Sequence, residues 1–540
     1  MGYKNNWHRY NSLTQQRLIT AQLSIGSSGS STAGWGYNCN SLQQHNLACR
    51  NNVNENQVQF TQPLGHDAAV GIIGGGISGL ACAQGLARHG MQAVVFDTGE
   101  HSVGGRAATR SSADASLRAE WISPALAGVK HLNLAFDHAA QCFTATDPAF
   151  QQQVQAWVAA GVVQRWQGPV GVLKPGGRFE PLGGEVPLYV ASKGMRQLAQ
   201  HMADEAVLSS SGGVSVVRPM WVSRMAASHS DNGWQLTGNS RGQGTFGAVV
   251  IAHNGKCANR LVGPTGAPGV ARQLMRLRLS AVWALMVAFE GAVAVPGGMQ
   301  GAFVQGSSVL SWAANNSAKL GLQHPEPHAQ LQCWTLISTN AYGQANKVPQ
   351  EKVPADVAAK VTQEMLDAFS ELLGPAAVQL PRPVFTRCLW GAALPTNTPN
   401  VPCILDAQAR VGVCGDWLTG ASLQSAVLSG WALADRLAVL RGVQSSAAAD
   451  LGLGLTEPFQ VLREAEIGEF PGVPKTAVAA APAAAAGGVA CGSNGGGRGR
   501  QQRRPRQQQQ LQRATVGGKQ QQGQQQGGGR PAAQAAGVRS

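Results

Sequence analysis

One short stretch, Ala69–Gly79, constrains the fold of this chain more than any other part of the sequence. It begins with an apolar run that predicts a buried strand, and it then carries the spacing G-x-G-x-x-G at Gly74, Gly76 and Gly79. In this spacing the first glycine makes a tight turn, the second lets the backbone approach a pyrophosphate, and the third lets helix and strand pack closely. Because Ile77–His89 reads as a helix rich in small residues, we expect its N–H groups and dipole to attract phosphates.

A second predicted strand, Ala93–Phe96, follows the helix and ends at Asp97. Asp97 lies 18 residues after Gly79, where a dinucleotide-binding βαβ unit carries the carboxylate that binds a ribose. A glycine-rich strand-to-helix loop without a ligand, and a strand-end acid facing solvent, are the alternative interpretations. The combination favours a dinucleotide-binding unit.

A second glycine loop comes directly after this unit, at Gly104, Gly105 and Arg106. Two adjacent glycines are costly inside a helix or strand, so the pair indicates close approach of the backbone to a ligand. Arg106 adds a fixed cation whose forked donors suit phosphate. A simple nicotinamide dehydrogenase does not need such a loop, whereas an extended FAD lies beside one in glutathione-reductase-like flavoproteins.

The charge of the chain lies mainly outside its predicted folded body. The net charge is +14, but residues 471–540 hold ten basic residues and no acid, and residues 1–66 carry +3, which leaves +1 for residues 67–470. The body therefore gives no electrostatic argument for nucleic-acid binding. The basic Gln/Gly/Arg tail could bind RNA or an acidic protein through its charge alone, or it could be a solvated disordered extension.

The ten cysteines are scattered singly, without a metal-ligand spacing, so we predict no metal site and a reducing compartment. No apolar run is long enough to predict a membrane span. The leader is poor in acids and contains serine, which is typical of organelle transit peptides, and we expect the chloroplast, with the cytoplasm as the alternative.

Composition and periodicity divide the chain into segments. We expect a strand at Leu132–Phe136, helices at Gly194–Ala203 and Val353–Leu373, and an antiparallel sheet in the later part of the chain. The predicted segments are a disordered leader with a candidate transit peptide (1–66), a first nucleotide-domain segment (67–110), a first substrate-domain segment (111–190), a second nucleotide-domain segment (191–269), a second substrate-domain segment (270–395), a third nucleotide-domain segment (396–445), a C-terminal extension (446–470) and a disordered basic tail (471–540).

A third motif, Gly415-Asp416, precedes a predicted small-residue helix at Gln424–Leu440. Together the three motifs resemble the FAD-binding signature of the flavin amine oxidase superfamily. Within it, the segment from Phe136 to Ala145 is similar to renalase-like flavoproteins, and the segment His253–Arg260 resembles their plant and algal branch. The resemblance covers residues 67–445.

The resemblance implies an α/β fold: a doubly wound, Rossmann-like FAD-binding domain of glutathione-reductase or amine-oxidase type, with an inserted mixed-sheet substrate domain. FAD is the implied cofactor. Asp97 would hold the adenosine ribose, Asp416 would face the ribityl and phosphate groups, and the N-terminus of the last helix would point at the flavin. The residues expected to bind FAD are Gly74, Gly76, Ser78, Gly79, Asp97, Gly104, Gly105, Arg106, Val222, Gly415, Asp416, Gln424, Ser425 and Ala426.

Three residues are candidates for the chemistry beyond the flavin: His138, Gln141 and Lys319. His138 could also be a hydrogen-bonded structural histidine, and Lys319 could be a solvated lysine instead of holding a water at the flavin. Two positions depart from the family pattern, because Gln424 stands where relatives carry Glu and Cys142 stands where they carry Tyr.

The sequence thus predicts an FAD-dependent oxidoreductase, renalase-like or amine-oxidase-like, that removes a hydride from a small amine-like or reduced nicotinamide-like donor. Oxygen or an NAD(P)-type molecule would be the other small-molecule partner. A plastid isoprenoid desaturase or isomerase is one alternative. A non-catalytic flavin-binding scaffold with an RNA- or protein-binding tail is the other.

Overall fold

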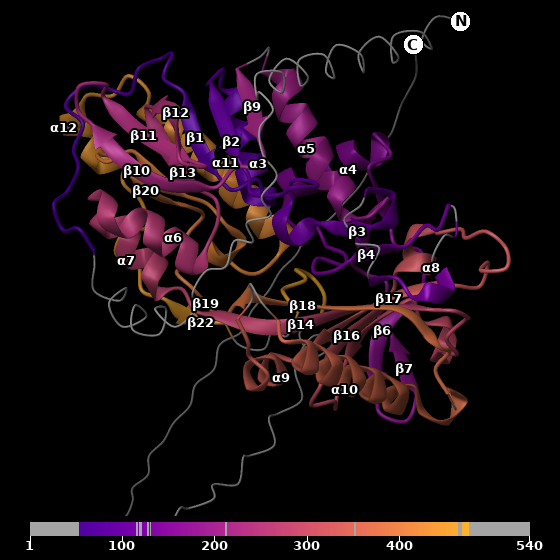
Figure 1. The fold of residues 1–540 in the computed structure, drawn as a ribbon. Helices are drawn as coiled ribbons and strands as arrows, with labels where there is room; N and C mark the ends of the chain where they lie inside the picture. Colours follow the sequence, from indigo (N-terminus) through magenta and orange to yellow (C-terminus); the bar gives the residue numbers. More distant parts are fainter. Residues whose placement is uncertain are drawn as a thin grey trace, which may run out of the picture. The chain divides into compact units, whose positions relative to one another are not determined.

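The described part of the chain is built around two large β-sheets, one of six strands and one of seven (Figure 1). The computed structural model describes residues 53–474 except 115–116, 118–120, 127–128, 130, 211–212, 350–352, 378 and 463–466. The transit peptide and most of the basic tail that the sequence predicts lie outside these residues.

The first sheet is six-stranded and has the order β20-β21-β13-β1-β2-β9. All its neighbouring strands are parallel except the edge pair β20 and β21. Its central strand is fully buried, as expected for a parallel strand that is covered on both faces. The strands are β1 (Val70–Ile73), β2 (Ala93–Phe96), β9 (Val214–Val217), β13 (Ala248–Ile251), β20 (Ile404–Asp406) and β21 (Val411–Val413).

Helices cover one face of this sheet, and a small antiparallel sheet together with two further helices covers the other (Figure 1). Val70 and Ile72 of β1 join a cluster with α3 and α11, whereas Ile73 joins a cluster with β11 and α6, because successive strand side chains point to opposite faces. This doubly covered parallel sheet confirms the predicted α/β, Rossmann-like fold. The covering elements are α3 (Ile77–Arg88), α5 (Met195–Ser209), α11 (Leu423–Leu440), β10 (Val222–Ser228), β11 (Gly233–Gly238), β12 (Arg241–Phe246), α6 (Gly255–Val262) and α7 (Pro268–Arg276).

The second sheet is seven-stranded, with the order β18-β14-β17-β16-β15-β6-β7. It is mixed, since β15 and β6 are parallel while the other neighbours are antiparallel. The helix α10 (Ala355–Leu373) buries Val361, Met365 and Phe369 in a cluster with side chains of β14 and β17. The strands are β6 (Val170–Lys174), β7 (Arg178–Pro181), β14 (Leu279–Phe289), β15 (Gly301–Val304), β16 (Leu310–Asn315), β17 (Gln332–Ser338) and β18 (Pro383–Pro395).

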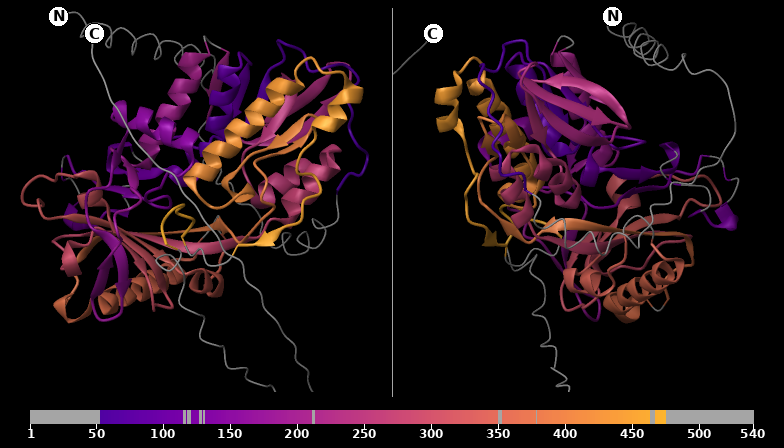
Figure 2. Two further views of the ribbon diagram at one scale, coloured as in Figure 1. Left: turned by 180° about the vertical axis from the view of Figure 1, so that it is seen from behind. Right: turned by 60° about the vertical axis from the view of Figure 1, so that its left-hand side comes forward.

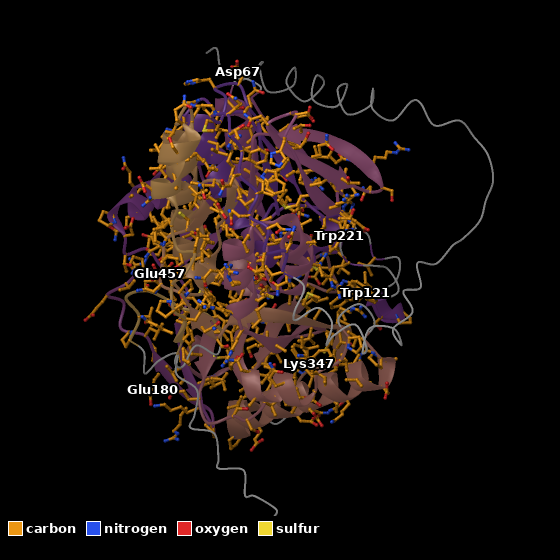
Figure 3. All side chains as sticks on the ribbon, turned by 90° about the vertical axis from the view of Figure 1, so that its left-hand side faces the viewer. Asp67, Trp121, Glu180, Trp221, Lys347 and Glu457 are labelled. Carbon is orange, nitrogen blue, oxygen red and sulfur yellow. The ribbon has the colours of Figure 1, made fainter. Side chains whose placement is uncertain are left out.

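Shorter elements connect and flank the two sheets. Side chains fill the layers between sheets and helices, while Trp221 and Lys347 mark two surface positions (Figure 3). Further elements are η2 (Gly105–Ala107), β3 (Thr109–Ser111), β4 (Ala135–Asp137), α4 (Pro148–Ala159), β5 (Val163–Arg165), β8 (Tyr189–Ala191), α8 (Asn316–Leu320), α9 (Asn340–Ala345), β19 (Asn397–Thr398), α12 (Ser445–Ala448) and β22 (Gln460–Val461).

The predicted boundary between leader and body, at residue 66, is wrong. Residues 53–66 already pack on the body, since Phe60 is 2 % and Leu64 1 % exposed. The Val58 N–H donates to the carbonyl of Gly266, and the Phe60 ring lies edge-on to Trp234 with centroids 5.7 Å apart. Sequence reasoning gave more weight to the polar composition of this segment than to its few apolar side chains.

Two predicted elements differ from the structure at their ends. The helix expected at Gly194–Ala203 is α5, which begins after Gly194 and continues to Ser209. Its extension keeps Ala206 buried against the parallel sheet. The strand expected at Leu132–Phe136 is the shorter β4 (Ala135–Asp137), which pairs with β3.

Within the described residues, no helix is long and apolar enough to cross a membrane.

Candidate functional site

The first glycine loop joins β1 to α3 and leaves open space at its middle glycine. Gly74 has φ +117°, and a Cβ there would lie 2.8 Å from the carbonyl oxygen of Ala252. A Cβ on Gly79 would lie 2.0 Å from the Gly74 oxygen, so helix and strand pack too closely for any side chain. A Cβ on Gly76 would meet no protein atom within 4 Å. The loop therefore provides a cradle that the protein itself does not fill.

Asp97 stands at the end of β2 with its carboxylate fixed beside this loop. It is 9 % exposed, and its Oδ2 accepts a 2.8 Å hydrogen bond from the Gly75 N–H. Its Oδ1 accepts another, also 2.8 Å, from the Gly99 N–H. Each carboxylate oxygen keeps a second lone pair, so the group can still accept a ribose hydroxyl. Val222, at the start of β10, is buried in the cluster that contains Phe96.

The second glycine loop lies directly against the first. The Gly104 N–H donates to the Gly75 carbonyl at 2.8 Å, and Gly76 and Gly104 form an isolated parallel bridge. A Cβ on Gly105 would lie 3.7 Å from the Cα of Gly76. Gly104 has φ +116°, a conformation that side chains rarely adopt. The two loops thus form one backbone surface.

Arg106 connects this surface to the third motif. Its Nη2 lies 2.6 Å from Oδ1 of Asp416, although the two residues are 310 positions apart in the chain. Burial lowers the pKa of Arg106, but the charge and hydrogen bond of Asp416 outweigh that effect and raise the pKa above its ordinary value. The guanidinium therefore stays charged beside the glycine loops.

The third motif is held against α3 by close helix packing. Figure 2 (left) shows α11 in orange along this side of the molecule. A Cβ on Gly430 of α11 would lie 2.4 Å from the carbonyl oxygen of Ser78 in α3. The Cys414 thiol lies 3.6 Å from the same Ser78 oxygen, and the Gly415 N–H donates to the Ser429 hydroxyl at 3.0 Å. Ser78 and Gly415 are thereby fixed relative to each other.

The first turn of α11 is largely bound within the protein. Ser422 caps the helix, and its hydroxyl accepts from the Ser425 N–H at 3.0 Å. The Gln424 side-chain oxygen accepts from the N–H groups of Thr146 and Asp147 at 2.8 and 3.1 Å. The Ala426 N–H donates to the Ser422 carbonyl. Gln424 thus joins α11 to the N-terminus of α4.

Lys319 lies in a buried ion pair. Its Nζ is 2.8 Å from Oδ2 of Asp137, and the two side chains are 0 % and 1 % exposed. Nζ also donates to the backbone carbonyl of Gln141 at 3.1 Å and lies 3.4 Å from its side-chain oxygen. The two hydrogen bonds to Gln141 and the charge of Asp137 hold the ammonium group and favour a structural role for Lys319. The role of Lys319 in holding a water at the flavin stays a prediction.

His138 and Gln141 both lie near Asp137. Burial, and then the charge of Arg110, lower the pKa of His138 to about 4, so its imidazole is neutral at physiological pH. The Gln141 amide donates to the backbone carbonyl of Asp137. Burial likewise raises the pKa of the neighbouring Cys142 thiol to about 12, so the thiol stays protonated while it is buried.

Sequence reasoning missed three residues that organise the site: Thr109, Asn316 and Ser429. The hydroxyl of Thr109 donates to Asp137 Oδ1 at 2.6 Å, and the Asn316 side chain accepts from the Asp137 N–H at 3.2 Å. Asn316 begins α8, and no local pattern in the sequence indicates which strand its side chain faces. Among the described residues, no group of three or more His, Cys, Asp or Glu could hold a metal ion.

The geometry defines a class of protein: a Rossmann-like parallel sheet whose glycine loops build a dinucleotide cradle. Residues 72–159 match the family model described as an NAD(P)-binding Rossmann-like domain. This match covers the end of β1, both glycine loops and α4, but not the third motif at Gly415 and Asp416.

Solved structures resemble the chain in outline. A putrescine oxidase is 12 % identical, covers 69 % of this chain and 98 % of its own, and has a TM-score of 0.45. A cyclohexylamine oxidase from Brevibacterium oxydans is 13 % identical, with 69 % and 99 % covered and a TM-score of 0.45. The protein CtdE in complex with FAD and a substrate is 11 % identical, with 71 % and 84 % covered and a TM-score of 0.43. Because these identities and TM-scores are low, the cofactor and activity proposed below are argued from this chain's own residues.

Proposed function

We propose that the protein is an FAD-dependent oxidoreductase that takes a hydride from a small donor. The observation that carries the proposal is the meeting of three motifs around one open cradle. Gly104 donates to Gly75, and Arg106 pairs with Asp416, so segments more than 300 positions apart surround the space beside Gly76. A nicotinamide dinucleotide would need only the first motif, whereas an extended FAD uses all three.

Each part of the cradle suits one part of FAD. Asp97 would accept the adenosine ribose, the α3 N-terminus beside Gly76 would face the pyrophosphate, and Arg106 would supply a cation near it. Asp416 would lie toward the ribityl chain. The N-terminal end of α11 would place its dipole at the flavin ring and favour negative charge there.

The residues around Lys319 would form the floor of the donor site in this proposal. FAD, when bound, supplies the hydride acceptor. Gln141 is held by the Asp137 carbonyl and by Lys319, so it would orient a donor. His138 is neutral and would therefore not repel a cationic donor. The protein's contribution would be orientation and exclusion of water.

The donor in this proposal is amine-like or reduced nicotinamide-like, as in renalase-like enzymes, and oxygen or an NAD(P)-type molecule would be the second partner. The proposed domains follow the two sheets: the parallel sheet would bind FAD and the mixed sheet would cover the flavin.

The decisive experiment begins with the colour of the purified protein. We expect a yellow protein, or a colourless one that becomes yellow on incubation with FAD. Anaerobic addition of amines and reduced nicotinamides should then bleach the flavin absorbance. A protein that binds no FAD overturns the proposal, and bleaching only by isoprenoid precursors would favour a desaturase or isomerase instead.

Gly76→Ala separates cofactor binding from folding. A methyl group at Gly76 meets no protein atom and its φ of −75° suits alanine, so stability should change by less than about 1 kcal/mol. The same methyl would occupy the space of the pyrophosphate and should weaken FAD binding at least about tenfold, or 1.4 kcal/mol. Fluorescence titration with FAD and urea unfolding measure the two effects.

Gly183→Ala is the matched control for this variant. Its Cβ also meets nothing within 4 Å, and it lies far along the chain from the cradle motifs. We expect unchanged FAD affinity. Equal affinity of Gly76→Ala and the wild-type protein would contradict the assignment of the cradle.

A further inference from the structure

The last described segment of the chain, Ile467–Val473, crosses the mixed sheet beside the start of α11. Figure 2 (left) shows it in yellow, between α11 and the strands of the larger sheet. Its first four residues belong to the predicted C-terminal extension, and its last three to the start of the predicted basic tail. We call it the C-terminal strap.

Backbone and ring contacts anchor the strap at two points. The Glu469 N–H donates to the carbonyl of Ala421 at 2.8 Å, one residue before the cap of α11. The Phe470 ring meets Phe303 of β15 edge-on, with centroids 5.2 Å apart and an interplanar angle of 83°. The strap therefore bridges the proposed flavin-facing helix and the mixed sheet.

The strap also contacts the loop that Gln424 binds. A Cβ on Gly472 would lie 2.8 Å from Val186 and 3.1 Å from the methyl group of Thr146. Thr146 in turn donates its N–H to Gln424 in the first turn of α11. All three contact regions, Ala421, Phe303 and Thr146, border the part of the molecule to which the proposed function assigns the flavin and its donor.

A row of aromatic rings leads from the strap to the buried Lys319. Phe470 packs on Phe303, Phe303 packs on Trp312 at 4.9 Å, and Trp312 packs on Trp166 at 6.4 Å. The Lys319 ammonium lies 5.7 Å from the Trp166 ring centroid. Cys142, next to Gln141, belongs to the same cluster of side chains, and Ile467, Phe470 and Val473 cover that cluster from outside.

The strap is held less firmly than the elements beneath it. Its apolar side chains are only partly buried, and it takes part in no strand pairing. Gly468 and Gly472 have φ of +113° and +84°. Segments with few buried contacts open at low free-energy cost, so the strap can admit a donor and then cover it.

We propose that the strap is the outer wall of the donor site and that Phe470 limits the size of the donor. This inference rests on the proposed function for the position of the flavin. Small, flat donors would stack on the aromatic row once the strap opens, whereas donors with a long or bulky substituent would prevent the strap from closing.

The first test measures how well the strap shields the Cys142 thiol from solvent, and it needs no flavin. N-ethylmaleimide labels thiols that solvent reaches, and peptide mass spectrometry resolves Cys142 from Cys333, which is buried in a different cluster. Phe470→Ala should raise the labelling rate of Cys142 about fivefold or more and leave Cys333 unchanged, because each is 6 % or less exposed in the intact protein.

Gly468→Ala loosens the strap without removing a ring. Its Cβ would lie 2.8 Å from the Ala421 oxygen, and its φ disfavours alanine. It should raise Cys142 labelling in the same direction. Phe179→Ala is the control, because Phe179 packs on the opposite face of the same sheet, in the cluster under α10.

The second test uses the full-length, FAD-loaded protein and two synthetic hydride donors. These are 1-benzyl-1,4-dihydronicotinamide and its bulkier 4-phenylbenzyl homologue. Each donor loses one hydride to FAD and leaves as a nicotinamide cation, so bleaching of the flavin reports the step. The smaller donor should react about tenfold faster in the wild-type protein, and this ratio should fall toward one in Phe470→Ala and Gly468→Ala but not in Phe179→Ala.

The outcomes separate the two proposals. A protein that binds no FAD overturns the proposed function, while Cys142 labelling still decides whether the strap covers the cluster. Unchanged labelling in both strap variants, or a size ratio near one in the wild-type protein, overturns the role of the strap. If Cys333 is also labelled faster in Phe470→Ala, this variant has unfolded. Cys142 labelling in Gly468→Ala then decides whether the strap covers the cluster.

Discussion

At the scale of single residues, the ion pair of Lys319 and Asp137 links parts of the chain that the sequence does not connect. Asp137 belongs to β4, Lys319 to α8, and the second carboxylate oxygen of Asp137 accepts from Thr109 and from the Met195 N–H at the start of α5. The carboxylate thus joins β4 to β3, to the start of α5 and to α8. A buried pair of this kind is costly to break because the remaining charge has no partner.

Lys319→Met should therefore destabilise the protein by about 3–5 kcal/mol, measured by urea unfolding. The double variant Asp137→Asn/Lys319→Met should recover part of this loss, since it removes the unpaired charge while the Asn side-chain oxygen can still accept the two hydrogen bonds. Arg382→Met, which removes an exposed partner of Glu290, serves as the control and should cost less than about 1 kcal/mol. A loss below 1 kcal/mol for Lys319→Met would show that the pair contributes little to stability.

At the scale of elements, the close crossing of α3 and α11 fixes the third motif against the first. Small residues make the approach possible, because Gly430 faces Ser78 and Gly85 faces Ala434 with no room for a further carbon atom. The crossing is thus the element that assembles the cradle from distant segments.

Gly430→Ala tests this crossing because helix propensity and packing change the stability of the protein in opposite directions. Helix propensity alone would make alanine more stabilising by about 1 kcal/mol. The new Cβ would lie 2.4 Å from the Ser78 oxygen, so overpacking should win and destabilise the protein by about 1–3 kcal/mol. Val439→Ala, at a 60 % exposed position of the same helix, should change stability by less than about 0.5 kcal/mol. A more stable Gly430→Ala protein in thermal unfolding would contradict the packing argument.

At the scale of the whole molecule, the folded part begins earlier than composition indicates. Residues 53–66 add Phe60 to the core beneath the small antiparallel sheet, and the Gln62 carbonyl accepts a hydrogen bond from the buried Arg410. Burial lowers the pKa of Arg410 to about 10, and the Arg410 guanidinium also lies 4.8 Å from the Phe60 ring centroid. The segment is part of the folded structure.

A chain that starts at Asp67 should be less stable than one that starts at Val53 by at least about 3 kcal/mol, the typical cost of losing a buried phenylalanine. Full-length Phe60→Ala should reproduce most of the difference. Thermal unfolding of the three proteins measures it. Equal melting temperatures for the two starting points would restore the boundary at residue 66.

The sequence alone determined the parts of this protein that are local. A strand followed by G-x-G-x-x-G and a helix, and an acid at the end of the next strand, form within 30 residues, so spacing predicted β1, α3, β2 and the position of Asp97. The glycines were predictable because only glycine fits their backbone conformations and close approaches.

Only the tertiary structure decided which distant residues meet. The pairing of Arg106 with Asp416, the burial of Lys319 against Asp137 and the contact of Phe470 with Phe303 each join segments more than 160 positions apart. No local periodicity carries that information, because the side chain that a buried charge or ring meets depends on how whole sheets and helices pack. The glycine loop organised the fold, and the packing around it decided what surrounds the cradle.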